Sequence, residues 1–88
     1  MITFTEARML VALWGKGKLP SRRKNIRYHV RERGNGDLWQ YLRKAYNFNK
    51  KGASARLLPD NRIHYERKSG EFLIEHDGYI VTYGFNRR

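Results

Sequence analysis

Cysteine is absent from this sequence, so no disulfide supports the fold and no thiolate can serve as a nucleophile or a metal ligand. Long apolar runs are absent as well, since none approaches the roughly 18 residues that span a bilayer. The N-terminus also lacks the basic and then apolar pattern of a signal peptide. We therefore expect a soluble protein that does not insert into a membrane and that is active in a reducing cytosol.

Acidic residues are scarce. The 88 residues include 8 Asp and Glu against 19 Lys and Arg, which gives a formal net charge of +11. Between Gly15 and Lys51, twelve basic residues stand against only Glu32 and Asp37. A positive field of this strength attracts polyanions and speeds their capture, so we expect a nucleic acid as the partner. The basic segments have no broad apolar face, which argues against binding to anionic lipid.

No repeat, low-complexity segment or linker divides the chain, and its length predicts one domain over residues 1–88. Three helices are predicted in the first half, over residues 4–14, 22–33 and 38–48. Each follows a residue whose side chain can cap the first turn: Thr3, Ser21 and Asp37. Gly15 and Gly34 are expected to end the first two helices. The predicted buried positions are Ala7, Leu10, Val11 and Trp14, then Ile26 and Val30, then Leu38, Tyr41, Leu42, Ala45 and Phe48.

After Gly52 the period of the apolar residues changes to two, which is typical of strands. Strands are predicted over residues 56–58, 62–67, 71–76 and 79–85. Asp77-Gly78, between the last two, is a strong signal for a two-residue hairpin. The predicted fold class is therefore α+β, with three N-terminal helices packed on one face of a C-terminal antiparallel β-meander of three to four strands.

The hairpin turn also predicts how the last two strands pair. An uninterrupted ladder gives three expected pairs: His76 with Tyr79, Ile74 with Val81, and Phe72 with Tyr83. The helices are expected to cover a face made by Phe72, Ile74, Val81 and Tyr83, joined by Ile63 and Tyr65. The opposite face is expected to carry Arg62, His64, Glu66, Glu71, Leu73, Glu75, Ile80, Thr82 and Gly84. A polar, titratable sheet face beside a basic helical half is typical of a functional site.

Histidine titrates near neutrality, as an acid–base pair for RNA transphosphorylation requires. In that reaction a base removes the proton of the ribose 2′-OH, which attacks the adjacent phosphorus, and an acid protonates the leaving 5′-oxygen. Arg or Lys stabilises the charge on the phosphoryl oxygens. No metal is required, because the nucleophile belongs to the substrate. His29 and His64 are candidates for proton transfer, whereas His76, beside the hairpin turn, is better suited to a structural role.

Arg62 is the candidate phosphate clamp, because it stands near His64 on the expected polar face. Thr82 is a candidate for orienting the phosphate through its hydroxyl. Each of these residues also has a structural interpretation, since His29 borders an apolar stripe, His64 suits an exposed position and Thr82 favours strands. The residues predicted to hold the RNA backbone are Lys16, Lys18, Arg22, Arg23, Lys24, Arg27 and Lys44.

A metal-dependent nuclease is an alternative that the sequence raises. Glu66, Glu71 and Glu75 fall on the expected polar face and would form an acidic cluster there. They are equally suited to pairs with Arg62 and Arg67 across the strands. The chain has no Cys/His zinc pattern, and GKGK at residues 15–18 lacks the spacing of a phosphate-binding loop. We therefore predict no metal and no cofactor.

Three parts of the chain resemble C-terminal toxin domains of bacterial contact-dependent and polymorphic toxin systems. They are GKGKLPSR at residues 15–22 with Tyr28-His29, QYLRKA at residues 40–45, and GEFLI at residues 70–74 with YIVTY at residues 79–83. The resemblance covers roughly residues 15–85 and rests on the order of the elements and on the basic loop. Such domains share the barnase–EndoU–colicin–RelE-like fold of ribonucleases. The resemblance implies an active site made by His29, Arg62 with His64 next to it, and Thr82.

The same resemblance implies tRNA or another structured RNA as substrate. It implies a dedicated immunity or antitoxin protein, acidic in character, that would cover the basic cleft. It also implies action in the cytoplasm of a target bacterium. The first fourteen residues fall outside the resemblance, and we expect either a free-standing protein or the C-terminal part of a larger secreted one.

We therefore predict a metal-independent endoribonuclease toxin that cleaves RNA, in particular tRNA, and leaves a 2′,3′-cyclic phosphate. The main alternative is a non-catalytic RNA- or DNA-binding module, in which Trp39 and Tyr46 would stack on bases if they face solvent. A third interpretation is a protein-interaction domain whose basic face binds an acidic protein.

Overall fold

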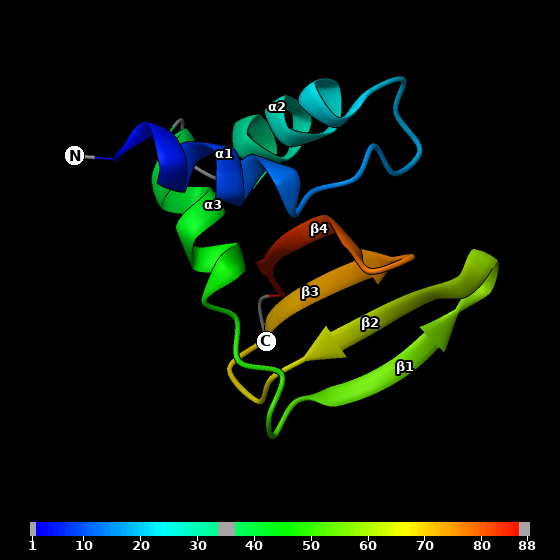
Figure 1. Cartoon of the computed structure of the whole chain (residues 1–88). Helices are drawn as coiled ribbons and strands as arrows, with labels where there is room; N and C mark the ends of the chain where they lie inside the picture. Colours follow the sequence, from blue (N-terminus) through cyan, green and yellow to red (C-terminus); the bar gives the residue numbers. More distant parts are fainter. Residues whose placement is uncertain (1, 34–36, 87–88) are drawn as a thin grey trace.

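The computed structural model describes residues 2–33 and 37–86 and shows the α+β fold predicted from the sequence (Figure 1). The helices are α1 (Phe4–Ala12), α2 (Arg22–Arg33) and α3 (Leu38–Tyr46). The strands are β1 (Ser54–Leu58), β2 (Arg62–Glu66), β3 (Glu71–His76) and β4 (Tyr79–Phe85). Each predicted element is present, although α1 and α3 end two residues earlier than predicted, β1 begins two residues earlier and β2 ends one residue earlier. The helix end predicted at Gly34 lies outside the described residues.

Local capping explains where the helices begin. Three side chains accept a hydrogen bond from the first turn: Thr3 Oγ1 from Glu6 N at 3.1 Å, Ser21 Oγ from Lys24 N at 3.2 Å, and Asp37 Oδ1 from Gln40 N at 3.1 Å. Each bond satisfies a backbone donor that a helix start leaves open. The three predicted caps are therefore confirmed. None of the described helices has the length and apolar character needed to cross a bilayer.

The four strands form one antiparallel sheet in the order β1-β2-β3-β4, so that strands consecutive in sequence are neighbours. Asp77 and Gly78 connect β3 to β4 with φ values of 52° and 84°. A two-residue type I′ turn requires this left-handed conformation at both central positions, which is why Asp-Gly is favoured there. The predicted hairpin is confirmed. A short 3-10 turn, η1 (Pro59–Asn61), connects β1 to β2.

A β-bulge in β4 changes the register that the turn alone predicts. Val81 is the extra residue, and beyond it each residue of β4 is displaced by one position. The observed pairs are His76 with Tyr79, Glu75 with Ile80, Ile74 with Thr82, Leu73 with Tyr83, Phe72 with Gly84, and Glu71 with Phe85. The predicted pairs of Ile74 with Val81 and Phe72 with Tyr83 are wrong, because the prediction assumed an uninterrupted ladder.

The register also corrects the two faces of the sheet. The face that the helices cover includes Leu73 and Ile80, which are 2% and 6% exposed. The outward face carries Arg62, His64, Glu66, Phe72, Ile74, Thr82 and Gly84. The expected positions of Phe72, Ile74, Leu73, Ile80, Glu71 and Glu75 are therefore wrong, whereas those of Arg62, His64 and Thr82 agree with the register. Residues 72–74 are all apolar, so alternation could not decide which of them turns inward.

The hydrophobic core lies between the helices and the β3–β4 side of the sheet, while β1 and β2 extend away from the helices (Figure 1). Its buried members are Leu10, Trp14, Ile26, Val30, Tyr41, Leu42, Ala45, Phe48, Leu73, Ile80 and Tyr83. Burying one large apolar side chain stabilises a fold by roughly 1.5–3 kcal/mol. The amphipathic patterns of the three helices thus place a shared apolar layer on one sheet face.

The segment after α1 pairs with β4 like a further short strand. Trp14 forms a parallel bridge with Ile80. Gly15 N donates to Ile80 O, and Ile80 N donates to Leu13 O, both at 2.8 Å. This pairing covers the edge of β4, where unpaired backbone groups would otherwise be left. It also starts the basic loop, residues 15–20, directly beside the bulge.

Candidate functional site

A pocket of about 300 Å³ lies where the basic loop, α2 and β4 meet, and we call it the α2 pocket. It is lined by Gly17, Lys18, Leu19, Asn25, Tyr28, His29, Arg62, Val81 and Thr82. Three of the four residues predicted to be catalytic, His29, Arg62 and Thr82, therefore line one pocket. They come from α2, β2 and β4, so only the tertiary structure brings them together.

Aromatic packing holds His29 in the wall of this pocket. The residue is 9% exposed, and its ring centroid lies 6.1 Å from that of Trp14. Tyr28 meets it edge-on, with the ring centroids 5.1 Å apart and the planes at 81°. The same imidazole thus packs on the core and lines the pocket, so its structural and functional interpretations are compatible.

Arg62 and Thr82 reach the α2 pocket from the outward face of the sheet. Arg62 begins β2 and Thr82 lies in β4, with β3 between them. Thr82 directly follows the bulge at Val81. Without that extra residue, strand alternation would turn the Thr82 side chain toward the helices. The bulge therefore determines the position of a pocket hydroxyl, a role that bulges often have next to active sites.

Asn25 joins α2 to the bulge and was not anticipated as a site residue. Its side chain is almost fully buried, and Nδ2 donates to Val81 O at 3.1 Å and to Gly15 O at 2.9 Å. These bonds satisfy two carbonyls that lie next to the pocket. The sequence offers no signal for this role, because a buried Asn in a basic helix has meaning only once the bulge is known.

Tyr28 is a second residue of the pocket that sequence analysis gave no role. It is 47% exposed, so much of its ring is open to solvent beside His29. An exposed aromatic ring next to cations is the arrangement that proteins use to stack on unpaired bases. Its position directly before a candidate catalytic histidine was the signal available in the sequence.

His64 lies on the outward face but lines a different pocket, of about 410 Å³. The other residues of that pocket are Gly52, Ser54, Arg56, Glu66, Arg67 and Lys68. The His64 ring stacks on Phe72 with centroids 5.5 Å apart, and its Nε2 lies 3.8 Å from Glu66 Oε1. Two predicted proton-transfer residues, His29 and His64, are therefore found in separate pockets.

The basic residues predicted to hold RNA are distributed around these pockets. Lys18 lines the α2 pocket, whereas Lys16 and Arg22 line a neighbouring pocket that shares Gly17 and Val81 with it. Arg23, Lys24 and Arg27 are exposed on α2. Lys44 is exposed on α3 and belongs to neither pocket. The cationic surface thus extends from the loop along α2.

The three glutamates considered as metal ligands do not lie together. Glu66 is on the outward face, while Glu71 and Glu75 are on the face that the helices cover. Glu75 Oε2 lies 2.6 Å from Lys50 Nζ, and Glu71 Oε1 lies 4.0 Å from Arg67 Nε. Within residues 2–33 and 37–86, no group of three or more potential metal-binding side chains is found. The acidic cluster considered from the sequence is therefore not formed.

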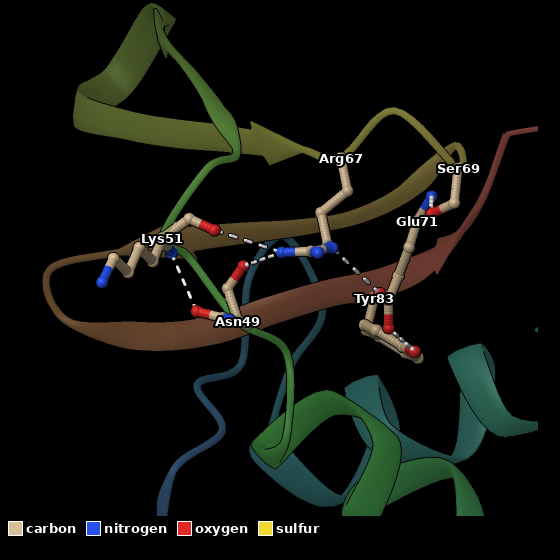
Figure 2. A network of polar contacts seen from close by, with 6 residues as sticks. All are labelled: Asn49, Lys51, Arg67, Ser69, Glu71 and Tyr83. Carbon is tan, nitrogen blue, oxygen red and sulfur yellow. Dashed lines mark hydrogen bonds and ion pairs between the residues drawn. The ribbon is translucent and has the colours of Figure 1, made fainter.

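One of these glutamates, Glu71, belongs to a polar network around Arg67 (Figure 2). Arg67 Nη1 donates to Asn49 O at 2.7 Å and to Lys51 O at 3.2 Å, which ties the loop before β1 to β2. Glu71 Oε2 accepts a hydrogen bond from the Tyr83 hydroxyl. The pKa of Tyr83 is raised above its ordinary value, mainly by burial and secondly by this hydrogen bond. This network is structural and lies apart from the α2 pocket.

The two aromatic residues considered for base stacking differ in exposure. Trp39 packs against the core and lines a pocket with Ala7, Arg8, Val11, Ala12 and Arg22. Tyr46 is 51% exposed at the end of α3. Only Tyr46 of this pair therefore presents a largely open ring, and it does so away from the α2 pocket.

Comparison of the chain with protein-family models, with curated proteins and with solved structures finds no match. The geometry of the α2 pocket and the charge around it thus carry the functional argument.

Proposed function

We propose that this protein is a metal-independent endoribonuclease that cleaves RNA by 2′-OH transphosphorylation. The single observation that carries the proposal is the meeting of His29, Arg62 and Thr82 in one pocket beside Lys18. These residues combine an imidazole, two cations and a hydroxyl, which are the groups that this reaction uses. The surrounding positive charge favours capture of a polyanion.

Each group has a role in the proposed reaction. His29 accepts the proton of the ribose 2′-OH as the 2′-oxygen attacks phosphorus. The bond between phosphorus and the 5′-oxygen breaks, and the leaving 5′-oxygen takes a proton from a second acid. Arg62 and Lys18 stabilise the charge on the phosphoryl oxygens, and the Thr82 hydroxyl donates a hydrogen bond to one of them. The products are a 2′,3′-cyclic phosphate and a 5′-hydroxyl.

His64 is our candidate for the second acid. It lies two residues along β2 from Arg62 and on the same outward face, although it lines the adjacent pocket. This role requires the phosphate held by Arg62 to lie between the two pockets, with its 2′-OH toward His29 and its leaving 5′-oxygen toward His64. His64→Ala is therefore expected to lower the cleavage rate less when the leaving group is a good one, such as a nitrophenolate, than with natural RNA.

The resemblance of residues 15–85 to toxin domains supports tRNA as the substrate and an acidic immunity or antitoxin protein as the partner. Such a partner would cover the α2 pocket and the cationic surface by charge complementarity. Expression of the chain in bacteria should then arrest growth, and His29→Ala should relieve the arrest. The toxin would act in the cytoplasm of the target cell.

The direct test is incubation of the purified protein with tRNA in the presence of EDTA, followed by analysis of the fragment ends. We expect cyclic phosphate ends in wild-type protein and loss of cleavage in His29→Ala and Arg62→Ala. Arg8→Ala removes the same charge from α1, outside the α2 pocket, and should leave cleavage intact. Cleavage that requires a divalent metal would contradict the proposed mechanism.

A non-catalytic RNA-binding module is the second candidate, and the exposed ring of Tyr46 favours it because an additional stacking site would serve binding rather than chemistry. Tight RNA binding without cleavage of tRNA, total RNA or DNA would support this candidate over the ribonuclease.

A further inference from the structure

A second pocket, of about 490 Å³, adjoins the α2 pocket, and we call it the hairpin pocket because the β3–β4 turn forms part of it. Its lining is Gly15, Lys16, Gly17, Arg22, His76, Asp77, Tyr79 and Val81. Gly17 and Val81 line both pockets. One extended ligand would therefore pass from one pocket to the other across the bulge.

The two pockets present the same four kinds of side chain. Each has a lysine from the basic loop, an arginine, a histidine and a tyrosine that is 47% exposed. These residues are Lys18, Arg62, His29 and Tyr28 in the α2 pocket, and Lys16, Arg22, His76 and Tyr79 in the hairpin pocket. Two cations and an open aromatic ring suit one phosphate and one base, so the pair of pockets suits two successive nucleotides.

The hairpin pocket is held in place by contacts of its own. Arg22 Nε donates to Trp14 O at 2.7 Å, which anchors the guanidinium beside the start of the basic loop. The chain at Gly15 lies so close to Tyr79 that a Cβ at position 15 would be 3.1 Å from the Tyr79 Cβ. The guanidinium of Arg22 and the base of the Tyr79 side chain are thus in place before any ligand binds, which reduces the entropy lost on binding.

Asp77 adds a carboxylate to the rim of this pocket. Its side chain is 72% exposed, and Oδ2 lies 3.7 Å from His76 Nε2. A carboxylate repels phosphate but accepts hydrogen bonds from a ribose hydroxyl or a base amine. Asp77 lines the same pocket as Tyr79, so a base that stacks on this ring would lie near the carboxylate.

We propose that the hairpin pocket binds the nucleotide next to the one whose phosphodiester bond is cleaved in the α2 pocket. Lys16 and Arg22 hold its phosphate, and the base stacks on Tyr79. The inference rests on the proposed ribonuclease function and names its substrate class. The substrate is an unpaired RNA segment of at least two nucleotides, because a base within a duplex cannot stack on a tyrosine.

The test measures the binding of a fluorescent 2′-O-methyl tetranucleotide, which lacks the nucleophilic hydroxyl and is not cleaved. Tyr79→Ala should weaken binding about 5- to 150-fold, the range expected for loss of one stacked base. Tyr79→Phe keeps the ring and should bind within about twofold of wild type. Phe4→Ala is the control, because Phe4 is an exposed aromatic ring on α1 that lines neither pocket. A Tyr79→Ala affinity equal to that of Phe4→Ala and of wild type would overturn the proposal.

The phosphate contact is tested by salt dependence. Lys16→Ala should reduce the slope of log affinity against log salt by about one. Lys51→Ala is the control, because it removes the same charge far from the hairpin pocket. Lys51 precedes Ser54, which pairs with Glu66 at one end of the sheet, whereas Arg62 pairs with His76 at the end where the hairpin pocket lies. Lys51→Ala should leave the slope near that of wild type. Equal slopes for Lys16→Ala and wild type, or equal affinities for a tetranucleotide and the matching duplex, would contradict the inference.

This design separates the two proposals. If wild type cleaves RNA but Tyr79→Ala binds the tetranucleotide as tightly as Phe4→Ala and wild type, the proposal for the hairpin pocket is wrong and the ribonuclease proposal stands. If binding depends on Tyr79 and Lys16 while wild type never cleaves, the hairpin pocket stands and the ribonuclease fails. Circular dichroism and thermal unfolding check that each variant is folded, and the exposure of Tyr79 leads us to expect a folded Tyr79→Ala.

Discussion

The side chain of Asn25 in α2 donates a hydrogen bond to the carbonyl oxygen of Val81, the bulged residue of β4, at 3.1 Å. The bulge leaves that carbonyl outside the regular β3–β4 ladder, and Asn25 supplies the missing donor. A second bond from the same amide reaches Gly15 O. One buried side chain thus connects the basic loop, α2 and the bulge that orients Thr82.

Asn25→Ala is expected to lower the free energy of unfolding by about 1–3 kcal/mol, because two carbonyls next to the core lose their donor. Urea denaturation measures this change. Lys24→Ala, at the exposed neighbouring position, should change stability by less than about 0.5 kcal/mol. In the proposed ribonuclease the Asn25 variant should also cleave more slowly at temperatures where it is fully folded, since Thr82 loses its support. Wild-type stability in Asn25→Ala would show that the bulge does not depend on this residue.

Thr82→Val tests the hydroxyl of the α2 pocket with little change of shape. We expect the cleavage rate to fall roughly 100-fold, as when one donor to the charged transition state is removed. Thr82→Ser keeps the hydroxyl and should lose much less activity. The rates are measured with single-stranded RNA in EDTA. If the Thr82→Val variant cleaves RNA as fast as the wild-type protein, the hydroxyl has no role in the reaction.

Gly70→Ala is expected to destabilise the fold by more than about 1 kcal/mol. Gly70 has a φ of 95°, and a Cβ there would lie 2.3 Å from the carbonyl oxygen of Asn86. Asn86 N also donates to Gly70 O at 2.8 Å, so the backbone after β4 is tied to this position. Gly52→Ala is the matched control, because Gly52 has a similar φ of 83° but nothing within 4 Å. Urea denaturation measures the loss of stability in both variants. A larger loss in Gly70→Ala than in Gly52→Ala gives the cost of the clash with Asn86, whereas equal losses would show that the backbone at Asn86 moves aside at no cost.

Alkaline pH should destabilise the protein through Tyr83. Burial and the hydrogen bond to Glu71 raise the pKa of Tyr83 in the folded state above its value in the unfolded chain. The folded protein therefore keeps a proton that the unfolded chain releases near pH 10. This contribution to stability is complete below that pH and is lost as the pH rises toward the folded pKa.

Urea midpoints between pH 8 and pH 11 measure this effect in wild type and in Tyr83→Phe. The stability difference between the two should shrink as the pH rises, because only wild type has the hydroxyl to ionise. Tyr46→Phe changes an exposed ring and serves as the control for tyrosine ionisation in general. A difference that stays constant over this range would contradict the assignment to Tyr83.

Much of the fold could be predicted because it depends on neighbours in the chain. Thr3, Ser21 and Asp37 cap helices through bonds to residues three positions away, and Asp77-Gly78 adopts the turn that its own backbone preferences favour. The grouping of His29, Arg62 and Thr82 could be proposed in part, because strand alternation placed the last two on one face. His64 shares that face but lines another pocket, a separation that alternation cannot show.

The sequence by itself determined the order of helices and strands, their caps, the hairpin turn and the excess of positive charge, since each depends on composition or on short-range geometry. Only the tertiary structure decided the bulge at Val81, the inward turn of Leu73, the buried bonds of Asn25 and the adjoining of the two pockets. These features depend on how the helices pack against β4, where contacts between distant residues outweigh local preference. A run of apolar residues such as 72–74 admits either face, and packing selects one.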